Sequence, residues 1–550
     1  MLRRLRIYFR WLYDHSAGVR WRIAANILLA CINIGLNLLF IYVCKQLVDI
    51  ATGVRAGSLE TVSFVAGGIA LLRIVVSALT TWMENITSSR MTFILRARLF
   101  SEVIQSRWYG RERMHTGDLT NRLESDVNTV TDIICSVLPE ILTTLIQLLA
   151  ATWFLALMDW RLALLLLLVT PVLLLISKTF FRRMRNLTRS IRETESRVQS
   201  HIQEVLRNRL VIKSLEQESA TMDRLDDFQE AELDQVAARA RMNIASRSIV
   251  SLSFSGGYLA AFLWGVYGIR RGTASFGMMT AFLQLVGQIQ RPAVNLTRQV
   301  PALIYATASI DRLMELEGTQ KEAAGHPILL KGIAGIRVDH LRFRYPDGHR
   351  DVIDGLTLDF TPGSRTAIFG ETGAGKSTLI RLILALLHPD EGTVTLYDGD
   401  RSVEASSRTR CNLVYVPQGN SLLSGSIRYN LRMGNPDASD EQMLEALDVA
   451  AAGFVRDLPE GLDSLCGEGG SGLSEGQAQR IAIARALLRP GSILLLDEFS
   501  SSLDPETEEK LLDHLTHTDL AAGKTMIFIT HREKIAAYCD TVVHLEKRRL

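Results

Sequence analysis

Long apolar stretches, rarely interrupted by charged residues, fill the N-terminal half of the chain. Residues 23–48 contain one charged side chain, Lys45, and residues 62–83 contain one, Arg73. Further apolar stretches cover residues 136–177, divided by a polar break at 158–161, and residues 244–269 and 277–301. About 20 apolar residues in a helix cross ~30 Å of hydrocarbon, so the pattern predicts six membrane-spanning helices. A water-soluble helical bundle is the alternative, and the length and low charge of the stretches argue against it.

Two polar stretches between the apolar ones are too long for simple turns. Residues 84–134 and 178–242 carry charged, helix-favouring sequence, so we expect the spanning helices to continue as two long arms. Outside the spans, 26 Lys and Arg residues lie in these stretches and in residues 1–22, whereas the opposite loops contain four. The positive-inside rule therefore predicts that the arms and both termini are cytoplasmic.

The second half of the chain has a different character. Residues 317–332 begin with polar sequence and contain three glycines, which predicts a linker. After it, strand-like segments such as 335–345 and 365–369 alternate with helix-like segments. We therefore expect an all-α transmembrane domain at 1–316, with six spans and two long cytoplasmic arms, and an α/β domain at 333–550.

Composition agrees with a chain that is partly embedded in a membrane. The 550 residues are 47% hydrophobic and 22% charged, with a mean hydropathy of +0.13. Sixty-one basic and 59 acidic side chains give a net charge of +2, so no overall field favours nucleic acid, and we expect no nucleic-acid partner. The six cysteines lie far apart, without the close pairs that are typical of zinc or redox sites.

A glycine-rich segment follows the strand-like residues 365–369. It reads Gly-Glu-Thr-Gly-Ala-Gly-Lys-Ser and precedes the helix-like residues 378–387. In such a loop the glycines let backbone N–H groups point at phosphate oxygens, Lys376 adds a positive charge, and the Ser377 hydroxyl can bind Mg²⁺. A glycine-rich turn without a ligand is the alternative, and the flanking strand and helix argue against it. The candidate nucleotide-binding residues are Gly370, Glu371, Thr372, Gly373, Ala374, Gly375, Lys376, Ser377 and Thr378.

Two carboxylates end the apolar strand-like segment 492–497. Asp497 is placed to serve Mg²⁺ through water, and Glu498 can polarise an attacking water molecule. A capping turn is the alternative for an acidic pair, and the glycine loop makes the magnesium role the stronger interpretation. Ser474 and Gln477 have the spacing of a capping box. This spacing predicts either a plain helix start or a helix start whose free N–H groups can donate to a phosphate.

Together these motifs resemble those of an ABC exporter half-transporter, in which six membrane helices are fused to an α/β P-loop ATPase domain. Residues 473–477 are similar to the family's signature motif and residues 501–504 to its D-loop. The resemblance implies that Tyr345 stacks on adenine, that Gln418 reaches Mg²⁺, and that His531 contacts the γ-phosphate. It implies that Glu498, His531 and Gln418 are catalytic and that Ser377, Gln418 and Asp497 bind Mg²⁺. It also implies that Ser474, Gly476 and Gln477 contact the nucleotide held by the opposite subunit.

The sequence departs from the family pattern at three places. Glu475 stands where the signature usually has glycine, which adds a negative charge near the phosphates. Leu465 and Gly469 stand where the family usually has glutamate and arginine. The sequence also stops soon after the strand-like residues 541–545, so we expect the family's closing strand and helices to be absent.

The resemblance implies an ATP-driven transporter that uses ATP and Mg²⁺. Its signature motif requires a second half-transporter, for which a homodimer is favoured over a heterodimer. Residues 117–126 and 204–213 resemble the two coupling helices, the second of which docks on the partner's nucleotide domain in exporters. We expect export of an amphipathic cargo, lipid-like, peptide or drug, across the bacterial cytoplasmic membrane, with both termini and the ATPase domain inside the cell. An importer or a nucleotide-gated channel on the same scaffold is the alternative.

Polar side chains inside the predicted spans are candidates for the transport path, because a charged or amide group in a span should face a cavity or a partner. Two interpretations stay open. One is a cavity of amide and cationic groups suited to an amphipathic or partly anionic cargo, and the other is interhelical hydrogen bonding with an ion pair between Arg73 and Glu140. The candidate substrate residues are Asn33, Asn37, Arg73, Gln284, Gln288, Arg291 and Asn295.

Overall fold

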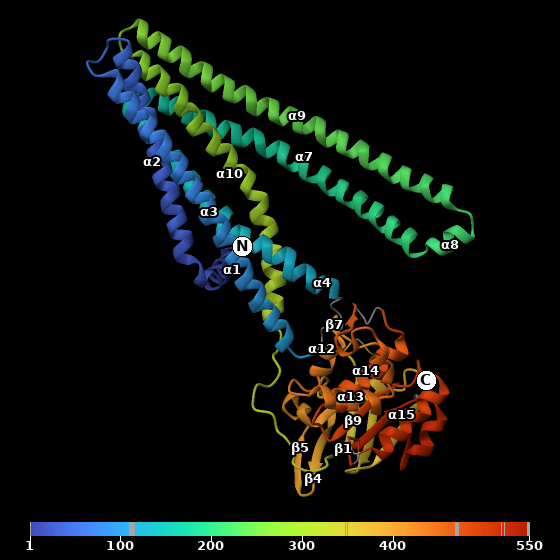
Figure 1. Cartoon of the computed structure of the whole chain (residues 1–550). Helices are drawn as coiled ribbons and strands as arrows, with labels where there is room; N and C mark the ends of the chain where they lie inside the picture. The colour runs from blue at the N-terminus through green and yellow to red at the C-terminus, as the bar shows by residue number, and fades with distance from the viewer. Residues whose placement is uncertain are drawn as a thin grey trace. The chain divides into compact units, whose positions relative to one another are not determined.

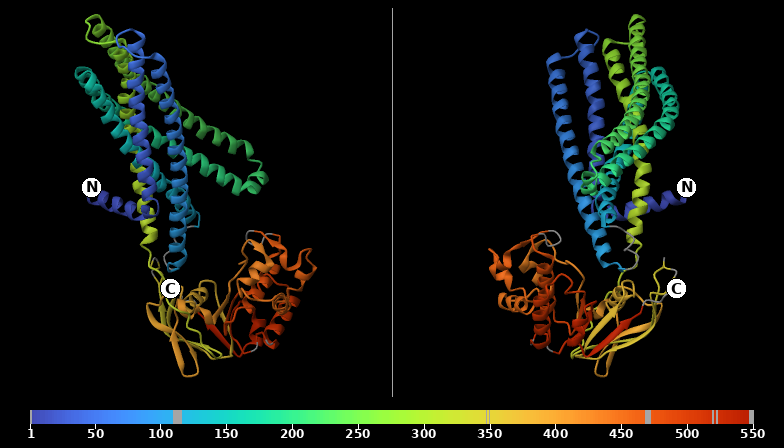
Figure 2. Two further views of the ribbon diagram at one scale, coloured as in Figure 1. Left: turned by 60° about the vertical axis from the view of Figure 1, so that its left-hand side comes forward. Right: turned by 90° about the vertical axis from the view of Figure 1, so that its right-hand side faces the viewer.

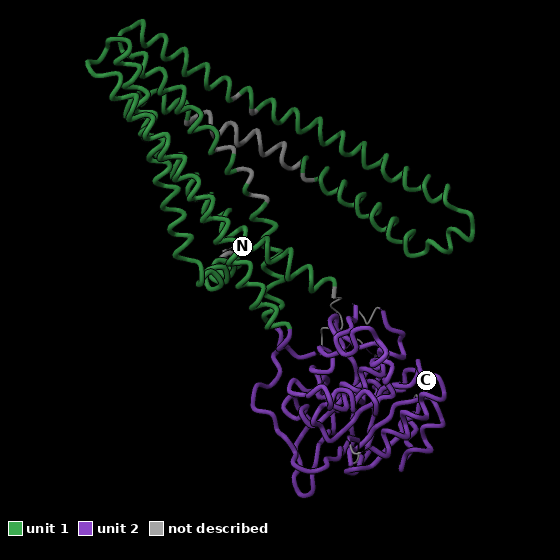
Figure 3. The backbone as a smooth tube through the Cα atoms, viewed as in Figure 1, with its two compact units in different colours: residues 1–103, 116–318 green, residues 104–115, 319–550 purple. Residues whose placement is uncertain are grey.

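The chain forms two compact units, which Figure 3 colours separately. One contains residues 1–103 and 116–318, and the other residues 104–115 and 319–550. The first is helical and the second mixes strands and helices, which confirms the predicted fold class. The computed structural model describes residues 2–108, 116–346, 348, 350–467, 472–518, 520–521 and 523–546, without the side chains of 2, 5, 116, 167–182, 185, 250, 253, 293–294, 297–298 and 300–301.

Long helices dominate the first unit (Figure 1). They are α1 (Leu2–His15), α2 (Arg20–Ala51), α3 (Leu59–Gln105), α4 (Thr116–Asn121), α5 (Val127–Asp132), α6 (Leu138–Met158), α7 (Trp160–Arg207), α8 (Arg209–Ser214), α9 (Glu218–Arg270) and α10 (Phe276–Glu317), with π-helical turns η2 (Arg122–Asp126) and η3 (Ile133–Val137). Among the described residues, four helical segments are long and apolar enough to cross a membrane: Arg20–Ala51, Leu59–Gln105, Gly117–Met158 and Glu218–Arg270. The other two predicted spans, 162–177 and 277–301, include side chains outside the described set.

The polar break predicted between the third and fourth spans is present. Asp159 separates α6 from α7, and its carboxylate accepts hydrogen bonds from the backbone N–H groups of Arg161 and Leu162. Trp264 Nε1 on α9 donates to the other carboxylate oxygen of Asp159 at 2.7 Å. Asp159 therefore caps α7 and joins the turn to a third helix.

Both predicted arms are largely helical in their described residues. The 47 residues of α3 reach about 70 Å at 1.5 Å per residue, far more than a bilayer core requires. α7 and α9 run side by side and α8 joins their ends (Figures 1 and 2). Across this pair Thr194 Oγ1 donates to Gln235 Oε1 at 3.2 Å. Residues 204–213, which resemble the second coupling helix, cover the end of α7 and most of α8, where Leu210 is 83% exposed.

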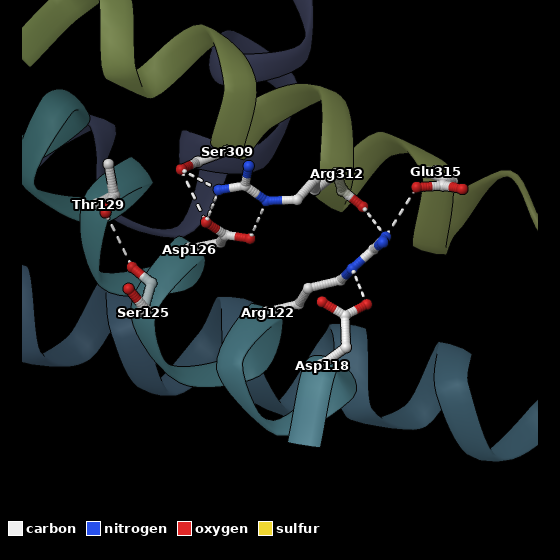
Figure 4. A network of polar contacts seen from close by, with 8 residues as sticks. All are labelled: Asp118, Arg122, Ser125, Asp126, Thr129, Ser309, Arg312 and Glu315. Carbon is white, nitrogen blue, oxygen red and sulfur yellow. Dashed lines mark hydrogen bonds and ion pairs between the residues drawn. The ribbon is translucent and has the colours of Figure 1, made fainter. Parts of the chain in front are cut away.

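A network of polar side chains joins the first coupling-helix-like segment, 117–126, to the C-terminal part of α10 (Figure 4). Asp126, which is buried, accepts hydrogen bonds from Arg312 Nε at 2.7 Å and from Ser309 Oγ at 2.8 Å. Arg122 Nη1 donates to Glu315 Oε2 at 2.8 Å. The other residues drawn in the network are Asp118, Ser125 and Thr129. The segment is thus fixed to α10, the last helix of the first unit.

The N-terminal helix also binds the end of α10. Trp11 Nε1 donates to Glu317 Oε2 at 2.7 Å, and His15 Nε2 lies 2.6 Å from Glu317 Oε1. Glu317, the first residue of the predicted linker 317–332, therefore belongs to α10 and takes part in the packing of the first unit. Irregular structure begins after it.

The second unit is built on two larger sheets in its described part. The antiparallel sheet has the order β2 (Ile353–Phe360), β1 (Gly335–Phe343), β4 (Glu391–Asp398), β5 (Arg401–Glu404), and the parallel sheet the order β11 (Thr541–Leu545), β3 (Arg365–Gly370), β10 (Thr525–Ile529), β9 (Ile493–Asp497), β6 (Leu413–Val416). A two-stranded sheet pairs β7 (Gly425–Ser426) with β8 (Leu465–Cys466). The α-helices are α11 (Lys376–Ile383), α12 (Ile427–Arg432), α13 (Asp440–Val449), α14 (Glu475–Leu487) and α15 (Pro505–His517). α11 begins and ends earlier than the predicted helix 378–387.

Strand β9 is fully buried, and its two faces belong to different hydrophobic clusters. Leu494 and Leu496 lie in the cluster that includes α14. Ile493 and Leu495 lie in the cluster that includes α11. Because successive strand residues point to opposite faces, α11 and α14 cover opposite sides of the parallel sheet.

Candidate functional site

The glycine loop connects the carboxyl end of β3 to α11, as the sequence predicted. Gly373 and Gly375 have φ angles of 87° and 95°, which a residue with a side chain rarely adopts. A Cβ atom on Gly370 would lie 2.6 Å from the carbonyl oxygen of Leu545 on the neighbouring strand. Of the other candidates on this loop, Ala374 and Thr378 are buried, whereas Glu371, Thr372 and Ser377 are exposed.

Lys376 closes the loop on itself. Its Nζ donates to the carbonyl oxygens of Gly370 at 2.6 Å and Glu371 at 3.2 Å, and lies 3.1 Å from His531 Nε2. Burial lowers the pKa of Lys376, and the negative charge of Glu498 opposes that shift. The ammonium group thus donates to carbonyl oxygens of its own loop. From this position it can turn to a phosphate.

The predicted catalytic residues meet at the carboxyl end of β9. Gln418 Nε2 donates to Glu498 Oε2 at 2.6 Å, and His531 Nε2 lies 3.1 Å from Glu498 Oε1. Glu498 has a φ angle of 45°, and its N–H donates to the carbonyl oxygen of Ile529, so the turn after β9 fixes the side chain's direction. Burial raises the pKa of the neighbouring Asp497, and the charge of Glu498 raises it further.

Tyr345 lies beside the first turn of α11. Its hydroxyl is 3.3 Å from Thr378 Oγ1 and accepts a hydrogen bond from Arg381 Nη1 at 3.2 Å. Its ring packs edge-on against Phe343, with 5.0 Å between ring centroids. The aromatic residue predicted to contact adenine therefore lies against α11, the helix that follows the glycine loop, through contacts that the sequence pattern did not reveal.

The capping box at the start of α14 is confirmed. Ser474 Oγ accepts from Gln477 N at 3.2 Å, and Gln477 Oε1 accepts from Ser474 N at 2.9 Å. Gly476 is buried, and a Cβ atom there would lie 2.7 Å from the carbonyl oxygen of Ser502 in the D-loop-like segment. Glycine at this position lets the signature-like segment and the D-loop-like segment approach closely, while Glu475 is exposed.

The structure adds a residue that motif reading missed. Arg532, next to His531, lies 2.6 Å through Nη1 from Glu508 Oε2 on α15. Its Nη2 donates to the carbonyl oxygen of Ser501 at 3.3 Å. Arg532 thus ties the histidine's segment to the D-loop-like segment. The sequence signal for this residue was its positively charged side chain directly after a candidate catalytic histidine.

A second missed contact concerns Asp497, one of the predicted magnesium ligands. Tyr415 Oη donates to Asp497 Oδ2 at 3.4 Å, and burial raises the pKa of that tyrosine above its usual value. Tyr415 lies on β6, the strand beside β9. Tyr415 lies three residues before Gln418 and contacts Asp497, so it connects the chain segments of two predicted magnesium ligands.

Of the residues that depart from the family pattern, Leu465 and Glu475 lie in the described part of the chain. Leu465, in β8, is 76% exposed, and residues 541–545 form β11, which pairs in parallel with β3. Gly469 lies outside the described residues. The acidic departure at Glu475 stands at the first position of α14, where a negative charge suits the helix dipole.

The candidate substrate residues lie on α2, α3 and α10. Asn37, Arg73, Gln284, Gln288 and Arg291 line one cavity, and Asn33 lines a second cavity together with Arg73. Asn295 is exposed and lines neither.

Both interpretations of these polar residues have counterparts in the structure. Gln147 Nε2 donates to Gln288 Oε1 at 2.6 Å, which is an interhelical hydrogen bond. Glu140 accepts from Gln299, while the guanidinium carbon of Arg73 lies 5.4 Å from the ring centroid of Phe40.

Comparison with known proteins places both halves of the chain. Residues 23–293 match the family of ABC transporter transmembrane regions, and residues 353–501 match the ABC transporter family. YknV, an ABC transporter ATP-binding protein of Bacillus subtilis, is 28% identical over 517 residues, which cover 93% of this chain and 84% of that protein. The ATM1-type heavy metal exporter of Novosphingobium aromaticivorans is 34% identical over 313 residues, 56% of this chain and 50% of the exporter.

A solved structure extends the likeness to the complete fold. A bacterial Atm1-family ABC exporter with ATP bound has a TM-score of 0.78 and 25% sequence identity, covering 96% of this chain and 94% of its own. This chain thus combines regions that match the membrane and ATPase families with a glycine loop, two adjacent carboxylates and the capped helix α14. The chain belongs to the ABC transporters and is an exporter-type half-transporter, a membrane protein that couples ATP hydrolysis to transport.

Proposed function

We propose that two copies of this chain form a homodimer that exports an amphipathic cargo, with two ATP molecules held between their ATPase domains. Each nucleotide then contacts the glycine loop of one copy and Ser474, Gly476 and Gln477 of the other. In this proposal residues 1–316 form the transmembrane domain, residues 317–332 the linker and residues 333–550 the ATPase domain.

The placement of α11 and α14 supports the dimer. The two helices cover opposite faces of the parallel sheet, because alternate residues of β9 belong to their separate clusters. The hydrogen bonds of Ser474 and Gln477 are to each other, and Lys376 bonds to its own loop. A glycine loop and a signature segment built on opposite faces complement those of a second copy rather than each other.

The donor atoms of the three predicted ligands fit Mg²⁺ by their chemistry. A hydroxyl from Ser377, a carboxylate from Asp497 and an amide oxygen from Gln418 are the oxygen donors that this cation prefers, and Asp497 is buried with a raised pKa. Bound there, Mg²⁺ would neutralise charge on the phosphate oxygens.

The protein's own groups then have distinct roles in hydrolysis. Lys376 leaves the carbonyl oxygens of its loop for the phosphates, and Tyr345 packs against the adenine. Glu498 orients the attacking water, and His531, 3.1 Å from that carboxylate, steadies the γ-phosphate. Gln418 contacts the Glu498 carboxylate, and its amide oxygen would help to hold Mg²⁺ when that ion is bound, so its position would depend on the state of the site.

The distribution of charge supports the orientation. The basic stretches 1–22, 84–134 and 178–242 lie on the same side of the spans, and we place this side, the termini and the ATPase domain in the cytoplasm of a bacterial cell, with the spans in its inner membrane. The end of the α7–α9 pair exposes several apolar side chains close together in the sequence, Leu206, Leu210, Val211 and Leu215, as expected of a segment that docks on a partner.

Inter-chain cross-linking tests the dimer. In a background without the six native cysteines, Ser474→Cys is combined with Thr372→Cys, and the protein is incubated in lipid with ATP under oxidising conditions. We expect a disulfide between chains that forms faster with ATP. Ser439→Cys with Thr372→Cys is the matched control, because Ser439 caps α13 through the same kind of capping box. Equal cross-linking by the control pair, or none from the signature pair in any nucleotide state, contradicts the proposal.

A further inference from the structure

A cavity of about 820 Å³ opens between helices α2, α3, α9 and α10. Its volume is in the range of small-molecule binding sites. Apolar side chains that include Phe40, Phe254 and Tyr258 form much of its wall. Such a wall accepts the apolar body of an amphipathic molecule, so the chemistry of the polar lining decides which molecules fit.

The charged lining of this cavity is entirely positive. Arg73 from α3 and Arg291 from α10 line it, and the described lining side chains include no carboxylate. Among the described residues, the buried Nε of Arg73 has no hydrogen-bond partner. A cation inside an apolar span is costly unless an opposite charge approaches it, and the described side chains of the cavity wall do not supply one.

Gln290 adds an unsatisfied amide to the same wall. It is 3% exposed, and neither Nε2 nor Oε1 has a hydrogen-bond partner within the described part of the chain. A Cβ atom on Gly257 of α9 would lie 1.9 Å from this Nε2, so the glycine makes the space that the amide occupies. The neighbouring Gln288, by contrast, is satisfied by Gln147. A buried amide without a partner lowers stability, and a bound polar ligand would remove that penalty.

We propose that this cavity binds the anionic group of an amphipathic cargo, with Arg73 and Arg291 as counter-charges and the Gln290 amide as a hydrogen-bonding group. The inference rests on the proposed export function and specifies its substrate class as organic anions with an apolar body. The aromatic wall holds that body, and the two guanidinium groups, on different helices, clamp the carboxylate, sulfonate or phosphate.

Binding of a matched pair of fluorescent probes tests the charge requirement. Dansylglycine carries a carboxylate, and dansylglycinamide has the same apolar body without the charge. Affinity is measured without ATP on the full-length protein in phosphatidylcholine nanodiscs. We expect the wild-type protein to bind dansylglycine at least about tenfold more tightly, and the Arg73→Gln/Arg291→Gln protein to lose this preference. Arg270→Gln, a surface charge at the end of α9, should leave both affinities and the basal ATPase rate unchanged.

A second variant separates ligand binding from folding. Gln290→Leu should weaken the binding of dansylglycine while the thermal midpoint of the protein stays the same or rises, because it removes an unpaired buried amide. Competition of lysophosphatidylglycerol or lysophosphatidylcholine with the bound probe distinguishes the sources of the anion. Displacement of the probe by the anionic lipid alone assigns the site to lipid headgroups. Displacement by neither lipid assigns it to soluble anions.

Equal affinity of the wild-type protein for the two probes, or a preference that survives in the double arginine variant, overturns the inference. Because binding is measured without ATP, a protein that fails to pump still reports on the cavity. ATP-driven export of neutral amphiphiles, with no preference for charge, would keep the proposed function and remove only the anion site.

Discussion

Asp126 and Arg312 form a two-point contact between the coupling-helix-like segment and α10, in which both carboxylate oxygens of the aspartate accept from the guanidinium group. Asp126 is only 2% exposed and also accepts from Ser309. Asp126→Ala would leave both donors without this partner. We expect it to destabilise the protein by about 2 kcal/mol, measured by unfolding in lipid nanodiscs.

Asp118 provides the matched comparison for that substitution. It pairs with Arg122 at 2.9 Å in the same network, but its side chain is 43% exposed. Asp118→Ala should therefore cost no more than about 1 kcal/mol. Equal losses in the two variants would show that burial does not decide the strength of these ion pairs.

Glu498 and His531 should act together on the chemical step. Glu498→Gln keeps the contact with Gln418 but removes the carboxylate that orients water, so we expect ATPase activity to fall by about 10²–10³-fold while ATP still binds. His531→Ala should give a similar loss, and the double variant should lose little more, because the two groups serve one water. Initial rates and ATP affinity in lipid measure this, and additive losses would contradict a shared role.

The raised pKa of Asp497 predicts a trade-off between stability and activity. A carboxylate whose folded pKa lies above the unfolded value destabilises the fold at high pH, and this effect disappears at pH values below the unfolded pKa. Asp497→Asn should thus raise the thermal midpoint at neutral pH, by an amount that shrinks in acid, while Mg²⁺-dependent ATPase activity falls more than about 100-fold. Calorimetry from pH 4 to 8 checks the sign.

Asp504 should behave in the opposite way in the same experiment. Hydrogen bonds from the backbone of Thr507 lower the pKa of this N-cap carboxylate. Its contribution is present above the unfolded pKa and is lost as the pH falls through the folded value. Asp504→Ala should therefore lower the midpoint at neutral pH, with the difference fading in acid. The same sign for both variants would mean that burial and capping are not the causes.

Close packing at Gly476 predicts a steric effect on the signature helix. A methyl group there would meet the carbonyl oxygen of Ser502 at 2.7 Å, so Gly476→Ala should force the two segments apart, with a loss of about 1–3 kcal/mol and a reduced ATPase rate. Gly453→Ala is the control, because a Cβ atom at that position has no neighbour within 4 Å. A Gly476→Ala protein with wild-type stability and activity would argue against the close approach.

Local chemistry explains which parts of this architecture the sequence could reveal. The glycine loop, the carboxylates after β9 and the capping box of Ser474 and Gln477 each depend on neighbours within a few residues, and the structure has the strands and helix starts at these places. Helix ends were less predictable. α11 stops at Ile383, although the apolar sequence continues beyond it, because periodicity does not show where a helix meets another element.

Contacts between distant segments could not be read from the sequence. Arg532 joins Glu508 and Ser501, and Gln290 fits against Gly257, from elements that are far apart along the chain. Their spacing follows no local period, so only the packed fold reveals them. The candidate polar residues of the spans were visible in the sequence, but the sharing of one cavity by residues of α2, α3 and α10 required the three-dimensional arrangement.

The placement of α11 and α14 on opposite faces of the parallel sheet also has a genetic consequence. If each working site takes its glycine loop from one copy and its signature segment from the other, a copy with a damaged signature still folds, pairs and binds ATP. Co-expressed with intact copies, it draws them into mixed pairs in which one of the two sites lacks an intact signature segment. Alleles of this kind should act as dominant negatives, whereas alleles that prevent folding should be recessive.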